Sequence, residues 1–64
     1  MKFIIKNSEG QYYEGITNRR IKFTEDEEKA WQFEDIYKAQ EEIIIIKKLF
    51  GITELEIEGF DSFI

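Results

Sequence analysis

The chain of 64 residues contains no cysteine, histidine or proline. The lack of cysteine excludes disulfides and thiolate metal sites as sources of stability. The lack of histidine removes the commonest general base and a usual zinc ligand. Ser8 and Ser62 are the only serines, and neither lies in the sequence context of a catalytic nucleophile. No phosphate-binding glycine motif occurs. We therefore expect a protein that is not an enzyme and that binds no cofactor or metal.

Long apolar runs are missing as well. The apolar residues near Met1 are interrupted at Lys6, too early for a secretory signal peptide, and no stretch is long enough to span a bilayer. We therefore expect a cytoplasmic protein without a membrane role. A helix lying on a membrane surface is not expected either, because the polar side of residues 36–50 mixes glutamate with lysine.

The chain is instead rich in apolar residues and in acids. It is 42% hydrophobic and 16% aromatic, and nine basic and fourteen acidic side chains give a net charge of -5. The length predicts a single domain, residues 1–64. A domain this small buries only about 60% of its unfolded surface, so its stability depends on a dense core or on association. The negative charge disfavours direct binding to nucleic acid.

Alternating apolar residues predict three strands in the first third of the chain. Residues 2–6 and 11–16 are predicted to form a hairpin around a turn at residues 7–10, and residues 20–23 a third strand. Within the second strand, alternation predicts that Tyr12 and Ile16 share one face while Tyr13 and Gly15 share the other. Gly15 inside a strand indicates a bulge or a close backbone approach.

A short helix is predicted after the third strand. Thr24 and Glu27 have the spacing of a capping box, in which each side chain binds the backbone N–H of the other. The helix is expected to end near Ala30 or Trp31, after which Trp31 and Phe33 dock on the core. The acids at residues 25–28 could bind a cation, but they lack the spacing of a calcium loop and are better explained as caps and surface.

The main helix is predicted at residues 36–50, with Asp35 as its N-terminal cap and Gly51 as its C-terminal cap. Its core-facing stripe follows helical spacing: Ile36, Ala39, Ile43, Ile46 and Phe50. Two alternatives remain open at this point. One is a single helix over residues 25–50, and the other is a buried strand at residues 43–46, because isoleucine prefers strands.

The last segment, residues 52–60, is predicted to be a strand with Leu55 and Ile57 on one face. The predicted fold class is therefore α+β, a small antiparallel or mixed sheet of three to four strands packed against one main helix. The order is strand, strand, strand, short helix, long helix, strand. If the last strand lies beside the first, the helical connection predicts that these two run parallel.

Four consecutive isoleucines at residues 43–46 point in nearly every direction around a helix, so one small core can cover only some of them. The expected function is a protein–protein interaction module that binds another protein or a second copy. The predicted contact residues are Ile44, Ile45, Leu49, Phe63 and Ile64. The alternative is a monomer in which Trp31, Phe33 and the C-terminal tail cover both flanks of the helix.

A second hypothesis concerns the acidic face of the last strand. Glu54, Glu56 and Glu58 are predicted to project about 7 Å apart, a spacing that resembles the charge density of a phosphate backbone. Such a row could occupy the nucleic-acid groove of a host protein, although an ordinary solvated strand face has the same pattern.

Direct binding of nucleic acid has one local argument. Arg19, Arg20 and Lys22 lie near Tyr12 and Tyr13 in the sequence, and bases stack on aromatic rings beside basic residues. The acidic net charge opposes this interpretation, so we expect no direct nucleic-acid partner.

The layout resembles small proteins from phages and prophages of low-GC Gram-positive bacteria. The segments that carry the resemblance are residues 2–6, 12–15, 23–26, the Ala30-x-x-Phe33 pair and the helix after Asp35. The resemblance implies a small accessory protein that inhibits or redirects a host protein, and it transfers no catalytic or ligand-binding residue.

Overall fold

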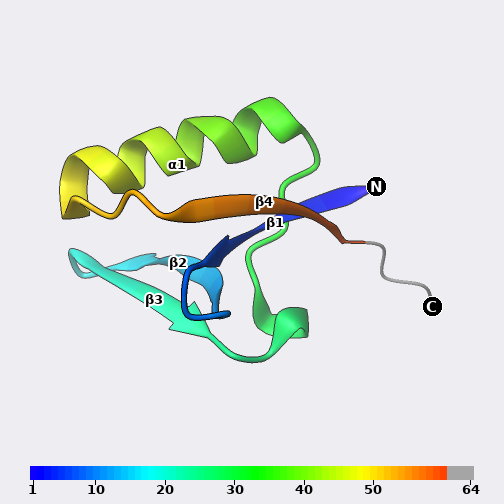
Figure 1. Ribbon diagram of the computed structural model, residues 1–64, viewed down its shortest axis with the longest axis horizontal. Coiled ribbons are helices and arrows are strands. Elements are labelled where there is room, and N and C mark those ends of the chain that lie inside the picture. The colour runs from blue at the N-terminus through cyan, green and yellow to red at the C-terminus, as the bar shows by residue number, and fades with distance from the viewer. Residues whose placement is uncertain (61–64) are drawn as a thin grey trace.

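The computed structural model describes residues 1–60, which form a four-stranded sheet and one main helix (Figure 1). The elements are β1 (Lys2–Asn7), β2 (Tyr12–Thr17), β3 (Arg20–Thr24), the 3-10 helix η1 (Glu27–Lys29), α1 (Ile36–Phe50) and β4 (Leu55–Phe60). The predicted α+β class and element order are confirmed. Among the described residues, no helix is long and apolar enough to cross a membrane. The predicted contact residues Phe63 and Ile64 lie outside the described range.

The sheet has the order β3-β2-β1-β4, and every neighbouring pair is antiparallel. β4 pairs with β1 along its whole length, from Phe60 opposite Lys2 to Leu55 opposite Asn7. The expected parallel pairing of the first and last strands is therefore wrong. Its cause is visible in Figure 1: α1 runs in the same direction as β1, and the four residues 51–54 return the chain directly beside the helix. A connection of four residues is too short to carry the chain back along the helix, so β4 runs opposite to α1 and therefore opposite to β1.

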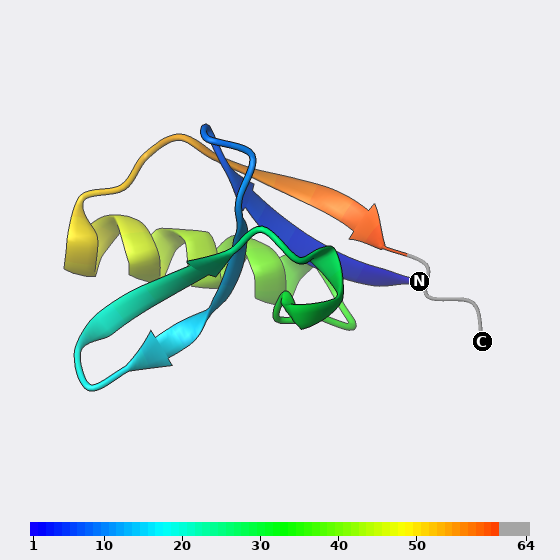
Figure 2. The same cartoon turned by 90° about the horizontal axis from the view of Figure 1, so that it is seen from below.

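The chain passes through the sheet between β1 and β2. These two strands are paired at Lys6 and Tyr12, and residues 31–33 fill the space beyond that point. Phe3 and Phe33 exchange two backbone hydrogen bonds of 2.8 and 2.7 Å, and the N–H of Trp31 donates to the carbonyl of Tyr13 at 2.8 Å. In Figure 2, η1 lies in front of the sheet and α1 behind it. The segment thus carries the chain from one face to the other.

Both faces of the sheet are consequently covered by buried apolar residues. The larger cluster lies between the sheet and α1 and contains Ile5, Tyr13, Phe33, Ala39 and Ile46. The smaller cluster lies on the η1 side and contains Ile4, Ala30 and Phe60, with Tyr12 packed against it. Successive strand residues point to opposite faces. Ile5 and Tyr13 therefore belong to the larger cluster, and their neighbours Ile4 and Tyr12 lie at the smaller one.

A β-bulge in β2 changes which residues face α1. The β2–β3 register shifts between Tyr13 and Gly15, and Gly15 has a φ of +148°. The extra residue brings Ile16 to the same side as Tyr13, where it packs against the larger cluster. The predicted pairing of Ile16 with the Tyr12 face is therefore wrong. The bulge expected at Gly15 is confirmed, whereas the Trp31 ring lies at an ordinary contact distance, 3.6 Å from where a Cβ would stand.

The boundaries of α1 agree with the prediction. The Asp35 carboxylate accepts from the N–H of Tyr37 at 2.8 Å. Gly51 has a φ of +70°, and its N–H donates to the carbonyl of Lys47 at 2.9 Å. Residues 43–46 are helical, and residues 30–35 separate η1 from α1. The strand alternative and the single-helix alternative are both wrong.

The predicted capping box at Thr24 is wrong. Thr24 belongs to β3 and pairs with Tyr12, so the chain is still extended there. Its hydroxyl accepts from the N–H of Asp26 at 3.1 Å, and the Asp26 carboxylate in turn accepts from the N–H of Glu28 at 3.0 Å. Asp26 is therefore the cap of η1, two residues later than expected, and the Glu27 carboxylate does not complete a capping box.

Candidate interaction surface

The four isoleucines of α1 divide between the core and the surface. Ile46 is fully buried and Ile43 is half-buried against the larger cluster. Ile44 and Ile45 are 53% and 43% exposed. The division follows from geometry, because consecutive helical residues are rotated by about 100° and one sheet covers only one side of the helix. Both predicted contact residues in this run therefore lie on the surface.

Two further apolar side chains extend this surface. Leu49, a predicted contact residue, is 66% exposed, and Tyr37 is 70% exposed. Tyr37 was not predicted as a contact residue. It lies seven residues before Ile44, which is about two helical turns, so both share one side of α1. Helical periodicity could have identified it.

Ile36 does not belong to the buried stripe as predicted, because it is 39% exposed. The fully buried stripe residues are Ala39 and Ile46. Ile36 is rotated by about 60° from the direction of Ala39 and lies in the first turn of α1. Ile43 shares this direction two turns later and is half-buried, so the exposure of Ile36 follows from its position in the first turn and not from the side of the helix on which it lies.

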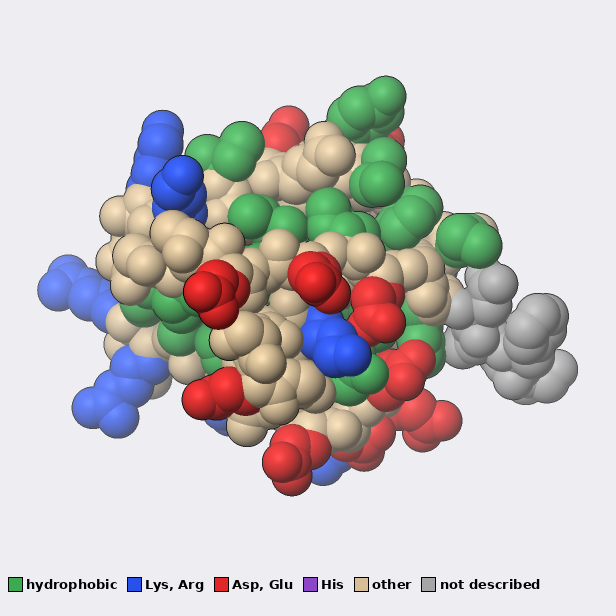
Figure 3. Space-filling model, viewed as in Figure 1, with side chains coloured by type: hydrophobic (Ala, Val, Ile, Leu, Met, Phe, Trp, Pro, Cys, Tyr) green, Lys and Arg blue, Asp and Glu red, His purple; other side chains and the backbone are tan. Residues whose placement is uncertain are grey.

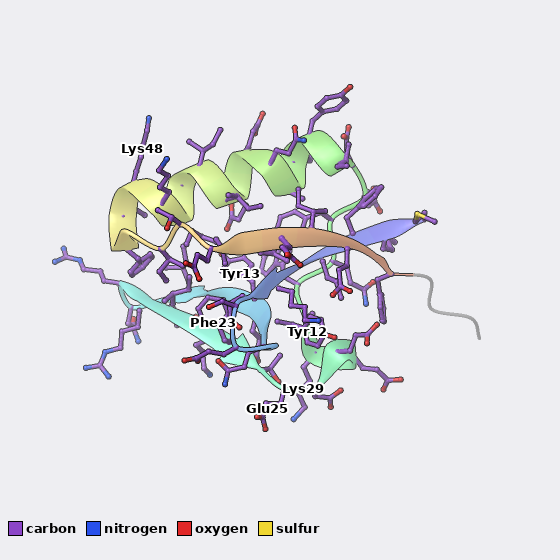
Figure 4. All side chains as sticks on the ribbon, viewed as in Figure 1. Tyr12, Tyr13, Phe23, Glu25, Lys29 and Lys48 are labelled. Atoms are coloured by element: carbon purple, nitrogen blue, oxygen red, sulfur yellow. The ribbon has the colours of Figure 1, made fainter. Side chains whose placement is uncertain are left out.

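Charged residues flank the exposed isoleucines. Glu41 and Lys48 are both exposed and lie seven residues apart on the outer side of α1, with Ile44 and Ile45 between them. Lys48 points away from the sheet (Figure 4). We call the set Tyr37, Glu41, Ile44, Ile45, Lys48 and Leu49 the outer face of α1. It combines apolar side chains with one charge of each sign.

One polar contact joins α1 to the sheet. The hydroxyl of Tyr13 donates a hydrogen bond to the carboxylate of Glu42. Burial raises the pKa of Tyr13, and the neighbouring Glu42 carboxylate raises it further. The phenol is therefore neutral at physiological pH and serves as the donor. This contact joins β2 to α1 in the rotation that buries Ala39 and Ile46 and leaves Ile44 and Ile45 facing outward.

Basic and acidic side chains gather in different places on the molecule (Figure 3). The C-terminal end of α1 and the β2–β3 turn lie at the same end of the long axis in both ribbon views. This basic end contains Arg19, Arg20, Lys47 and Lys48, all exposed. Acidic side chains gather across the lower right of the view, around η1. Positive and negative side chains are therefore separated on the molecule, although the net charge is negative.

Two members of the predicted glutamate row, Glu56 and Glu58, lie on β4 on the η1 side of the sheet, whereas Glu54 precedes the strand, which begins at Leu55 and not at residue 52 as predicted. Glu54 and Glu56 are exposed, whereas Glu58 is half-buried. One carboxylate oxygen of Glu58 is buried without a hydrogen bond, 4.0 Å from the Lys6 amine. That distance allows Coulomb attraction but is too long for a hydrogen bond. Lys6, on the neighbouring strand β1, thus partly neutralises the negative charge of the row.

The two arginines and the two tyrosines considered for nucleic-acid stacking are not brought together. Tyr13 is 1% exposed, so its ring is not accessible to a base. Tyr12 packs against the smaller cluster. Arg19 and Arg20 lie at the opposite end of the hairpin from Tyr12, about five residues or roughly 17 Å along β2.

No metal centre is formed by the acids of η1. Within residues 1–60, no three carboxylates converge closely enough to hold a cation. The Asp26 carboxylate instead caps η1. A hollow between the β1–β2 turn and the residues that lead into β4 is lined by turn and strand-end residues, among them Ser8, Glu9 and Glu54.

Comparisons with protein-family models, with curated proteins and with solved structures find no match to this chain. The resemblance to small phage and prophage proteins therefore stays a prediction. The geometry of the surface is the basis for assigning a function.

Proposed function

We propose that this protein is a non-enzymatic protein–protein interaction module and that the outer face of α1 is its contact surface. The observation that carries the proposal is the exposure of the adjacent Ile44 and Ile45, at 53% and 43%. Tyr37 and Leu49 enlarge the apolar area around them. Contiguous apolar surface rimmed by polar groups is typical of contact sites on small proteins.

The energetics support a contact rather than ordinary surface. Single exposed apolar residues are common on folded proteins and need no explanation. Four large apolar side chains along one helix are different, because covering them removes apolar area from water at about 25 cal/mol per Å². The rigid helical backbone also means that little conformational entropy is lost on binding.

The test compares Ile45→Glu with Lys22→Glu, which places a glutamate on the exposed surface of β3, away from the outer face. Both substitutions should leave the circular dichroism spectrum unchanged, because both positions are exposed. Association, whether with a second copy or with a protein captured by the immobilised chain, should be lost in Ile45→Glu and kept in Lys22→Glu. Association that is equal in the two variants, or absent from the wild type, would overturn the proposal.

The acidic side supports a second candidate function, an inhibitor that occupies a basic nucleic-acid groove of a host protein. The supporting observation is that the β4 glutamates lie on the same side of the sheet as the carboxylates of η1. The acidic set is Glu25, Asp26, Glu27, Glu28, Glu54, Glu56 and Glu58. Its size exceeds that of the glutamate row considered from the sequence.

High salt separates the two candidates. An exposed ionic contact weakens strongly when the Debye length falls to about 3 Å at 1 M salt, whereas an apolar contact does not. Replacing Glu54, Glu56 and Glu58 by lysine should abolish binding to a basic partner and leave binding through α1 intact. Binding that survives both the salt and the three substitutions excludes the acidic candidate.

A further inference from the structure

Residues 41–48 of α1 have an inverted charge symmetry. The sequence Glu-Glu-Ile-Ile-Ile-Ile-Lys-Lys has its midpoint between Ile44 and Ile45, with two acids before it and two bases after it. If a second such helix runs antiparallel about this midpoint, every acid opposes a base. If it runs parallel, every charge opposes its own sign.

The structure selects which of these eight residues could take part. Ile43 and Ile46 face the sheet, and Glu42 binds Tyr13. Glu41, Ile44, Ile45 and Lys48 all lie exposed on the outer face of α1. Lys47 is also exposed, but it is rotated by about 100° from Lys48 and lies on a flank of the helix. The subset on the outer face therefore keeps the symmetry of the whole segment: one acid, two isoleucines, one base.

We infer that the outer face of α1 binds a second copy of this chain in an antiparallel, two-fold arrangement. The inference rests on the proposed function and names the partner. In this arrangement Ile44 of each copy packs against Ile45 of the other. Glu41 of each copy faces Lys48 of the other, so each dimer has two such pairs. A two-fold contact uses the same patch on both copies, which a self-complementary surface satisfies.

The helix dipoles favour the same arrangement. A two-fold axis across the middle of α1 makes the two dipoles antiparallel, so each negative C-terminal end lies near a positive N-terminal end. Side chains at the start of α1 add no net negative charge to this attraction, because Glu34 is paired with Lys2 at 2.9 Å and Lys38 offsets Asp35.

The contact is small. α1 has 15 residues, which corresponds to a length of about 22 Å. One helix face is less than the roughly 800 Å² per partner of a standard stable interface. We therefore expect a reversible equilibrium between monomer and dimer that depends on protein concentration, with a contact held mainly by the isoleucines and oriented by the charges.

The test exchanges the charges one at a time. Glu41→Lys and Lys48→Glu should each weaken self-association about tenfold, because each turns two attractive pairs per dimer into two repulsive ones. An equimolar mixture of the two variants should associate as the wild type does. In the mixed dimer, the new lysine of one variant faces the new glutamate of the other, and the remaining Glu41 faces the remaining Lys48. The double variant should also recover self-association.

The measurement is sedimentation velocity over a concentration series up to the millimolar range, with circular dichroism to check the fold of each variant. Lys22→Glu is the matched control for a charge change away from α1. If a charge reversal unfolds the chain, Glu41→Gln and Lys48→Gln replace the reversals. Each should then weaken the dimer, and mixing them should recover part of the loss, because the Lys48 kept by one variant faces the Glu41 kept by the other.

Three outcomes overturn the inference. The first is self-association in Glu41→Lys and Lys48→Glu that equals the wild type, and the second is a mixture that associates no better than its components. A wild type that stays monomeric at millimolar concentration also overturns it. If that monomer binds another protein in an Ile45-dependent way, the proposed function stands without the dimer. If it binds nothing, both fail.

Discussion

The hydroxyl of Tyr13 on β2 donates a hydrogen bond to the carboxylate of Glu42 on α1, 29 residues further along the chain. Tyr13 is 1% exposed and packs with Phe23 and Phe33, so its ring cannot move independently of the core. The contact forms in the rotation of α1 that buries Ala39 and Ile46 in the core and leaves Ile44 and Ile45 facing outward.

Tyr13→Phe should lower the free energy of unfolding at pH 7 by about 1 kcal/mol, since it removes one hydrogen bond to a half-buried carboxylate. It should also change the pH dependence. The pKa of Tyr13 is raised in the folded state, so its stabilisation is complete below the ordinary tyrosine pKa of about 10 and is lost as the pH rises above it. Urea unfolding between pH 8 and pH 11.5 measures this.

Wild type should therefore lose more stability than Tyr13→Phe over that range, and the two should converge at high pH. Tyr37→Phe is the control, because Tyr37 is 70% exposed. Parallel stability curves for wild type and Tyr13→Phe would contradict the assignment of Tyr13 as a buried neutral donor.

The isoleucine run contains a matched pair for testing burial. Ile46→Ala should cost about 2–5 kcal/mol of stability, because it leaves a cavity at a fully buried position. Ile44→Ala removes the same atoms from an exposed position and should change stability by no more than about 0.5 kcal/mol. Urea unfolding at low micromolar concentration gives both values without a contribution from association. Equal losses in the two variants would show that α1 is rotated differently.

Gly15 tests the bulge of β2. Gly15→Ala should destabilise the chain by about 1–3 kcal/mol, because its φ of +148° is strained for any residue with a Cβ. Steric contact with Trp31 adds little, since the added Cβ would lie 3.6 Å from the nearest ring atom. The fluorescence of Trp31, the one tryptophan of the chain, reports unfolding.

The control is Gly59→Ala in β4, which needs no left-handed backbone and would contact the flexible side chain of Met1 at 3.2 Å. This change should cost less than Gly15→Ala. An equal cost at both positions would mean that the special backbone at Gly15 contributes nothing.

Local patterns were sufficient for α1. Asp35 and Gly51 mark its ends through contacts within the first and last turns, so the boundaries at residues 36–50 depend on neighbouring residues alone. The exposure of Ile44 and Ile45 follows from the same logic, because a helix with a single covered side leaves other sides in water. Most of the candidate surface could therefore be predicted from the sequence. Tyr37 was not predicted, although its spacing of seven residues from Ile44 places both on one side of the helix.

Non-local contacts caused the errors. Thr24 fits a capping box in isolation, but pairing with Tyr12 keeps it in β3. Trp31 was expected on the core, yet its backbone binds Tyr13 while its side chain lies over Gly15 and is 55% exposed. The antiparallel direction of β4 depends on the path of the chain between β1 and β2, which no local pattern encodes.

The sequence by itself determined the strand and helix segments, the caps of α1 and the presence of surplus apolar surface, because these depend on residues within one or two turns of each other. Tertiary structure alone decided the direction of β4, the shift of Ile16 to the helix side and the gathering of four cations at one end. These features depend on groups far apart in the sequence, such as Tyr13 and Glu42, whose positions become related only when the sheet and the helix pack.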